Sequence, residues 1–168
     1  DTSLLNLTHG LHPADLAELI NELRPEEAVY LYRTLNEESA ADVMLELDEE
    51  AFYTQLNSNI MAFGMEETIA KIIFPFLQHI GILWQTNTIN PAQEHFITYL
   101  IRQKLIVAID EITGERIRKD HRKIILFLPE GELHEISLLY TCYLLKKLGH
   151  KVIYLGQSLP LHDLEAVQ

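Results

Sequence analysis

The sequence has one cysteine, Cys142, among its 168 residues, which excludes an internal disulfide. It also lacks an apolar run of membrane-spanning length, because the longest one, residues 72–83, is interrupted by Pro75 and by polar side chains. No basic segment followed by an apolar one opens the chain, as a secretory signal peptide would. These absences predict a cytoplasmic protein with no membrane segment in this chain.

Basic residues are scarce, and the net charge is −12. Residues 1–50 contain thirteen Asp/Glu and two Lys/Arg (net −11), whereas residues 51–168 contain twelve and eleven (net −1). Neither part is basic enough to bind nucleic acid. The difference in net charge between the two parts favours two modules with different partners. The sequence also has no Ser-His-Asp order, phosphate-binding glycine loop or zinc-finger spacing.

Three leucines in the acidic part, Leu23, Leu35 and Leu47, are spaced by twelve residues, and a pair of acids follows each one. The apolar residues between them recur at helical spacing, and Pro13 and Pro25 suit first helical positions. The pattern predicts three helices of about ten residues. Because none is long enough to be stable alone, we expect them to stack as a short helical solenoid.

Several short phrases in this acidic part are shared with a known family. They are LHPADLAELI at residues 11–20, LRPEE at 23–27, AADV at 40–43 and LELD at 45–48. Through these phrases, residues 8–50 resemble the cytosolic N-terminal domain of MgtE-type magnesium transporters. The resemblance implies an acidic surface that helps to sense magnesium. The alternative is that the carboxylates are solvated helix faces.

Longer helical patterns follow the acidic part and predict a helical-bundle cap over residues 51–112. The expected helices cover residues 52–63, 68–84 and 91–106. Gly64 predicts the end of the first helix, and Pro75 predicts a bend in the second. Asn90 is expected to cap the third helix, with Pro91 at its first position.

The last part of the sequence has the pattern of a strand, a helix and a second strand. After a polar linker at 113–122, the expected elements are a strand at 123–128, a helix at 134–148, a strand at 151–155 and the start of a helix at 161. Such a unit forms a parallel, right-handed pair of strands. The predicted fold class is α/β with a large all-α part. It consists of a short helical solenoid (1–50), a helical-bundle cap and a partial Rossmann-like (flavodoxin-like) parallel α/β domain (123–168).

Trp84, Glu94 and His95 are expected near one end of the bundle, because a short connection joins the two helices that carry them. The indole offers a broad apolar surface, and the Glu–His pair offers a hydrogen-bond donor, an acceptor and a metal ligand. The alternative is a core tryptophan beside a glutamate that interacts with the dipole at a helix start.

His134 lies just past the expected strand at 123–128, at the edge where open α/β sheets bind ligands. A neutral imidazole binds transition metals well, and Glu132 can fix its tautomer through the other ring nitrogen. Gly131 permits an unusual backbone angle or the close approach of a ligand. A purely structural role for this loop is the alternative.

These two groups of residues match two signatures of one family. Residues 80–84 (IGILW) and Glu94-His95 match a Trp-x9-Glu-His signature, and residues 130–135 (EGELHE) match an acid-x-His-x-x-Gly loop. Ser137 stands at the position of the last glycine of that signature. There it would place a side chain close to the ligand that the loop binds. Residues 50–168 therefore resemble the cobalamin-binding sensory region of MerR-type light- or cobalamin-responsive transcriptional regulators.

The resemblance implies adenosyl- or methylcobalamin as the ligand and the α/β part as its binding domain. It implies His134 as the lower axial cobalt ligand, supported by Glu132. Trp84, Glu94 and His95 would then cover the upper face of the corrinoid.

The predicted function is a ligand-sensing regulatory module rather than an enzyme. We expect a homo-oligomer that reaches DNA only through a domain outside this chain, and a change of cap packing and oligomeric state when the upper ligand is lost. Two alternatives stay open: a corrinoid carrier for methyl transfer, and a magnesium-sensing cytosolic domain of a transporter. The two resemblances also leave open a fusion or a truncated chain.

Overall fold

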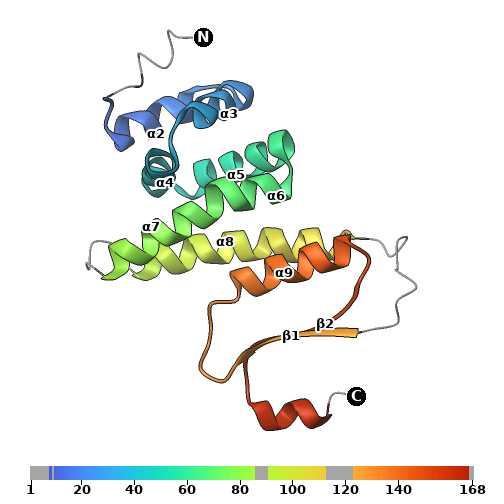
Figure 1. Ribbon diagram of the computed structural model, residues 1–168. Helices are drawn as coiled ribbons and strands as arrows, with labels where there is room; N and C mark the ends of the chain where they lie inside the picture. Colours follow the sequence, from blue (N-terminus) through green and yellow to red (C-terminus); the bar gives the residue numbers. More distant parts are fainter. Residues whose placement is uncertain (1–7, 9, 86–90, 113–122, 167–168) are drawn as a thin grey trace. The chain divides into compact units, whose positions relative to one another are not determined.

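Figure 1 shows a mostly helical chain with one small sheet, in a computed structural model that describes residues 8, 10–85, 91–112 and 123–166. The structure divides into two compact units, Asp1–Pro91 and Ala92–Gln168. This division falls inside the cap expected over residues 51–112, and the expected domain boundaries stay predictions.

The first unit contains three helices of ten residues each, which confirms the short helices that the sequence predicts. They are α2 (Pro13–Glu22), α3 (Pro25–Thr34) and α4 (Glu37–Glu46). Pro13 and Pro25 occupy first helical positions, as predicted. A local side chain accepts a hydrogen bond from one N–H at the start of α2 and of α4: Asn36 Oδ1, for example, accepts a hydrogen bond of 2.7 Å from the Ser39 N–H.

The repeated leucines end these helices. Leu23, Leu35 and Leu47 are the C-cap residues, with extended ψ angles of 151°, 146° and 140°. All three side chains are half-buried. An extended residue cannot continue a helix, so the twelve-residue spacing corresponds to one short helix plus one change of chain direction.

The next helix, α5 (Glu49–Phe63), ends at Gly64 as predicted. The φ angle of Gly64 is 82°, in the left-handed region that favours glycine and commonly ends helices. At its start, Asp48 Oδ1 accepts a hydrogen bond of 2.9 Å from the Ala51 N–H. Both ends of α5 are therefore set by residues of the local sequence.

The second long helix of the predicted cap is interrupted. It consists of α6 (Met65–Thr68), a π-helical turn (Ile69–Ile73) and α7 (Phe74–Gln85). Pro75 has no N–H, and its ring would clash with the carbonyl of residue 71 in a regular helix. The wider turn lies just before it, with the Phe74 N–H bonded to the Ile69 carbonyl. The helix is therefore irregular next to Pro75, in the form of a π-helical turn, and the predicted bend stays a prediction.

Helix α4 connects the short helices to the later ones, because it packs against both α2 and α7. Its Val43 and Met44 side chains have no exposed surface. Asp42 on α4 also pairs with His79 on α7, with Oδ1 and Nε2 2.8 Å apart. The short helices and the first helices of the predicted cap therefore share one core.

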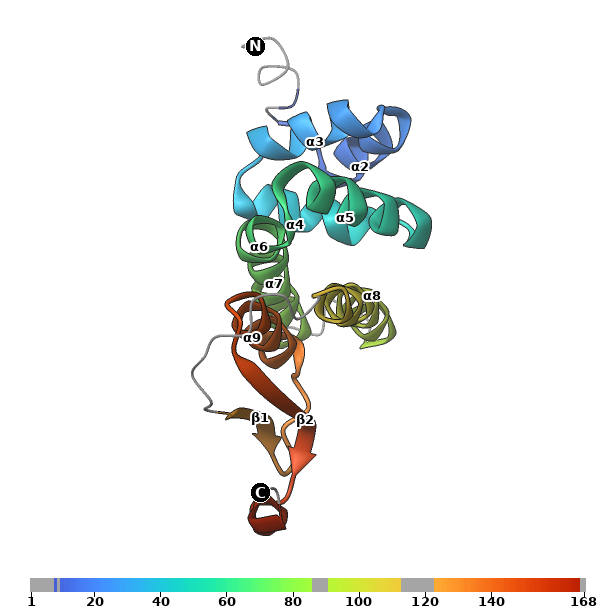
Figure 2. The same cartoon turned by 90° about the vertical axis from the view of Figure 1, so that its right-hand side faces the viewer.

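The second unit holds the helix that begins with Pro91, as predicted, followed by the sheet. Its elements are α8 (Pro91–Asp110), β1 (Lys123–Pro129), α9 (Ile136–Lys147), β2 (Lys151–Leu159) and a 3-10 helix (Leu161–Ala166). The strands pair in parallel, with Lys123 opposite Lys151, which confirms the predicted parallel pair. Helix α9 packs against both strands and lies on one side of them in Figures 1 and 2.

Two element boundaries in this unit differ from the prediction. Helix α9 begins at Ile136 and not at His134, because Glu135 is its N-cap residue. Strand β2 extends beyond Leu155 to Leu159, because Gly156 and Ser158 adopt positive φ angles of 83° and 54° and the pairing continues through register shifts.

Two predicted features, the Asn90 cap and the linker at 113–122, lie outside the described residues. Among the helices that are described, none combines the length and the apolar character that crossing a bilayer requires.

Candidate functional site

The loop that carries His134 follows the carboxyl end of β1, where the sequence places it. Gly131 in this loop has a φ angle of 86°, so the predicted unusual backbone angle is present. The Gly131 N–H donates a hydrogen bond of 3.2 Å to Ser158 Oγ, and the Ser158 N–H donates one of 3.1 Å to the Glu132 carbonyl. The end of β2 therefore holds the first half of the loop.

Glu132 holds His134 in two ways. Its Oε1 lies 2.7 Å from His134 Nδ1 and also accepts a hydrogen bond of 2.8 Å from the His134 N–H. These contacts, the backbone one first, lower the pKa of the Glu132 carboxyl group. The carboxylate can therefore only accept hydrogen bonds at neutral pH. In the neutral imidazole, the hydrogen then lies on Nδ1, which faces Glu132, and the lone pair of Nε2 is available.

The remaining surface of His134 is open. Its side chain is 94% exposed, and in the described part of the chain Nε2 has no polar partner. An imidazole with one nitrogen held by a carboxylate and the other facing outward is the usual arrangement of a metal-binding histidine. Ser137 is exposed in the first turn of α9, on the helix that follows this loop.

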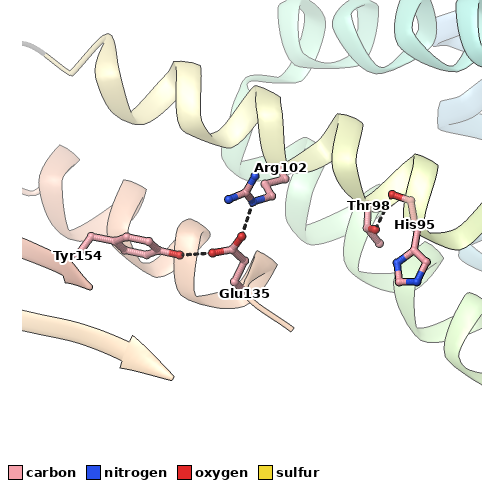
Figure 3. Close-up of polar contacts among 5 residues, drawn as sticks. All are labelled: His95, Thr98, Arg102, Glu135 and Tyr154. Atoms are coloured by element: carbon pink, nitrogen blue, oxygen red, sulfur yellow. Dashed lines mark hydrogen bonds and ion pairs between the residues drawn. The ribbon is translucent and has the colours of Figure 1, made fainter. Parts of the chain in front are cut away.

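Glu94 and His95 lie in the first turn of α8, as the sequence predicts. Their side chains are 25% and 79% exposed, and His95 Nδ1 is 3.6 Å from Glu94 Oε2. The Thr98 hydroxyl is shared between the carbonyls of both residues, at 2.9 Å from that of Glu94 and 3.1 Å from that of His95. Figure 3 shows the contact with His95. This hydroxyl supports the start of α8, where Glu94 also interacts favourably with the helix dipole.

Trp84 lies in α7, within the first unit, whereas Glu94, His95 and His134 belong to the second. The structure pairs Glu94 with His95 and Glu132 with His134. One site that combines all these residues with Trp84 stays a prediction.

A buried carboxylate beside His134 was missed from the sequence. Glu135 is 6% exposed, and its two oxygens contact Arg102 Nε on α8 and the Tyr154 hydroxyl on β2, the latter at 3.0 Å (Figure 3). Burial and this hydrogen bond raise the pKa of Tyr154. Glu135 falls inside the helix predicted at 134–148, and no local pattern reveals partners 33 and 19 residues away.

These three residues also line a cavity of about 330 Å³ between α8, α9 and β2. Cys142 lies in its wall and is 1% exposed. Burial raises the pKa of the Cys142 thiol, which disfavours the reactive thiolate. The side chain is therefore part of the core.

Comparison with known proteins confirms both resemblances. Residues 36–109 match the B12 binding domain, and residues 11–59 match the MgtE intracellular N domain. The two matches overlap at residues 36–59, which contain α4 and most of α5.

One curated relative is the HTH-type transcriptional repressor CarH of Myxococcus xanthus. The two proteins are 32% identical over 94 residues, which is 56% of this chain. The aligned part spans 30% of the length of that repressor.

Proposed function

We propose that this chain is a cobalamin-binding regulatory module in which His134 serves as the lower axial cobalt ligand through Nε2. The observation that carries the proposal is the Glu132–His134 pair, which directs one imidazole nitrogen outward at a strand end. The match of residues 36–109 to the B12 binding domain and the similarity to a transcriptional repressor support a cobalamin-binding regulatory module, while the assignment of His134 rests on the loop itself.

The residues of this loop fit a corrinoid. A corrinoid would bring most ligands of its cobalt with it, so the protein would have to offer only one further ligand. His134 offers it, with the orienting carboxylate that metal-binding histidines commonly have. Gly131 has no side chain and leaves the backbone open to a large planar ligand, with no atom within 4 Å of where a Cβ would stand. Ser137, exposed at the start of α9, is the neighbouring contact we propose.

Trp84, Glu94 and His95 are the residues that we propose for the upper face. The indole would cover apolar surface, while Glu94 and His95 would donate and accept hydrogen bonds there. When bound, an adenosyl- or methylcobalamin would supply a cobalt whose upper alkyl ligand can be lost. We infer that this loss changes the packing of these residues and the oligomeric state, which is a sensory role and not an enzymatic one.

Absorbance titration of the full chain with methylcobalamin in the dark tests the proposal. We expect the corrin spectrum to change on binding and His134→Ala to abolish or alter that change. His162→Ala is a matched control, because His162 is also exposed and lies 3.3 Å from an acid, Asp163. An unchanged spectrum in the unmodified protein, or equal effects of the two substitutions, would contradict the proposal.

A magnesium-sensing role is the second candidate, and the match of residues 11–59 to the MgtE intracellular N domain favours it. Within the described ranges, no group of three or more His, Cys, Asp or Glu side chains could hold a metal ion. Thermal stabilisation of the protein by magnesium, without any response to methylcobalamin, would select this candidate. A corrinoid carrier would instead transfer the methyl group to an acceptor when a methyltransferase is added.

A further inference from the structure

The residue that follows the proposed cobalt ligand is a buried glutamate with an unusual set of partners. Glu135 is the N-cap residue of α9, but its side chain makes no capping hydrogen bond. The free N–H groups of the helix start are the usual partners of an acid in this position. Instead, the carboxylate pairs with Arg102 and accepts a hydrogen bond from Tyr154. Its position is therefore set by the tertiary structure and not by the helix that it begins.

These contacts join three elements at one point. Arg102 comes from α8, Tyr154 from β2, and Glu135 from the start of α9, and Figure 3 shows Glu135 in contact with both of the others. The Glu135 side chain is 8% exposed, against 41% for Arg102. A carboxylate this buried is stable only while its partners stay in place, because an unpaired charge there would lack solvation. The contacts therefore fix Glu135, one peptide bond from His134.

The other side of the loop is fixed as well. Ser158 at the end of β2 bonds to the backbone of Gly131 and of Glu132. His134 thus lies between two anchored positions, Glu132 before it and Glu135 after it. Contacts within the chain therefore give the loop a defined conformation.

We propose that Arg102, Glu135 and Tyr154 are positioning residues, which hold the His134 loop to α8 so that coordination at His134 and the position of α8 depend on each other. This inference rests on the proposed cobalt site. Helix α8 also carries Glu94 and His95, which lie about 10–12 Å from Arg102 along the helix axis. A shift of the His134 backbone on coordination would therefore reach the helix that carries the proposed upper-face residues, and the coupling is reciprocal.

Binding of methylcobinamide to the full chain in the dark tests this coupling. Cobinamide has no nucleotide base of its own, so the spectrum reports coordination by a protein imidazole, with His134→Ala as the uncoordinated reference. We expect Glu135→Gln and Tyr154→Phe to lower the ratio of coordinated to uncoordinated corrinoid about tenfold, as removal of a ligand-orienting partner commonly does. Glu130→Gln, an exposed glutamate in the same loop, should match the unmodified protein.

Hydrogen exchange of the α8 amides provides the second measurement. We expect methylcobinamide to change protection in α8 of the unmodified protein and of Glu130→Gln, but not of Glu135→Gln. Circular dichroism shows whether each variant is folded. If Glu135→Gln is unfolded, Tyr154→Phe carries the test, because it removes only one hydroxyl group.

The outcomes separate this inference from the proposed function. The positioning role would be overturned if folded Glu135→Gln and Tyr154→Phe coordinated methylcobinamide as the unmodified protein does and showed the same change of α8 protection on binding. The cobalt site would then be left intact. An unmodified protein whose spectrum equals that of His134→Ala would overturn the proposed function, and with it this inference. Equal losses in Glu130→Gln and Glu135→Gln would also overturn the positioning role, because they would show a general effect of charge.

Discussion

The helix starts of the first unit and the His134 loop of the second unit are held by polar contacts that span different distances along the chain. In the first unit, Arg24 pairs with Glu27, and Asn36 caps the helix through the Ser39 N–H, contacts that each join residues three positions apart. Such contacts form as soon as a single helix turn forms. They define where helices begin and end, and apolar packing then assembles the helices.

In the second unit, the contacts that anchor the His134 loop to other elements join residues far apart in the sequence. The Gly131–Ser158 hydrogen bond spans 27 residues, and the Arg102–Glu135 pair spans 33. Contacts of this kind require the sheet and the helices to be in place first. The comparison indicates that the first unit is a stack of locally defined helices, whereas the second uses its tertiary structure to position a loop.

The largest expected effect concerns the packing of the first unit. Phe52 of α5 is 1% exposed, and its ring centroid lies 6.0 Å from that of Phe76. We expect Phe52→Ala to lower the free energy of unfolding by about 3–5 kcal/mol, because it removes a buried ring and leaves a cavity. Met61→Ala on the same helix, where the side chain is 88% exposed, should change it by less than about 0.5 kcal/mol. Urea unfolding measures both, and similar losses would show that apolar packing does not dominate this unit.

A smaller effect is expected in the loop of the second unit. Gly131→Ala should cost about 1–2 kcal/mol, because an L-residue is strained at a φ angle of 86°. The strain is the only cost, since no atom lies within 4 Å of the added Cβ. Gly81→Ala is the matched control: it also has open space, but it lies within α7 and should stabilise the protein by about 0.5–1 kcal/mol. If Gly131→Ala is also stabilising, the loop is not held in its observed conformation.

A single local contact of the first unit is expected to contribute about 1 kcal/mol. Asp48→Ala removes the oxygen that accepts the Ala51 N–H hydrogen bond at the start of α5. Asp48→Asn keeps an acceptor in the same place and should stay within a few tenths of a kcal/mol of the unmodified protein. Thermal unfolding of the two variants measures the difference. Equal stability would contradict the view that local capping defines α5.

The same contrast explains what could be predicted from the sequence. Pro13, Pro25 and Gly64 act on the residues next to them, so the ends of the first-unit helices were predicted well. The parallel strand pair was also predictable, because an apolar strand, a helix and a second strand follow one another closely.

The features that were not predicted depend on distant partners or on unusual backbone angles. Glu135 was placed inside a helix, because its contacts with Arg102 and Tyr154 form only in the folded protein. The extension of β2 was missed because Ser158 adopts a φ angle of 54°, which a serine does not usually take. In the candidate site, the sequence predicted the Glu132–His134 pair correctly but not the residues that hold the loop.

The smallest expected effect is a difference in how two lowered carboxyl pKa values respond to salt. The pKa of Glu27 is lowered mainly by a side-chain hydrogen bond from Arg24, and that of Glu132 mainly by the His134 backbone N–H. A lowered pKa favours the folded state above the pKa of the unfolded chain, and this contribution is lost as the pH falls through the lowered value.

NMR titration of the two carboxyl groups, at about 0.05 M and about 1 M salt, measures this response. Salt should move the pKa of Glu27 toward its ordinary value more than that of Glu132, because it screens a charged guanidinium but hardly affects a neutral N–H donor. Equal shifts for both groups would show that charge and not backbone geometry lowers the pKa of Glu132. In that case, the Glu132–His134 pair would be as sensitive to salt as the Arg24–Glu27 ion pair of the first unit.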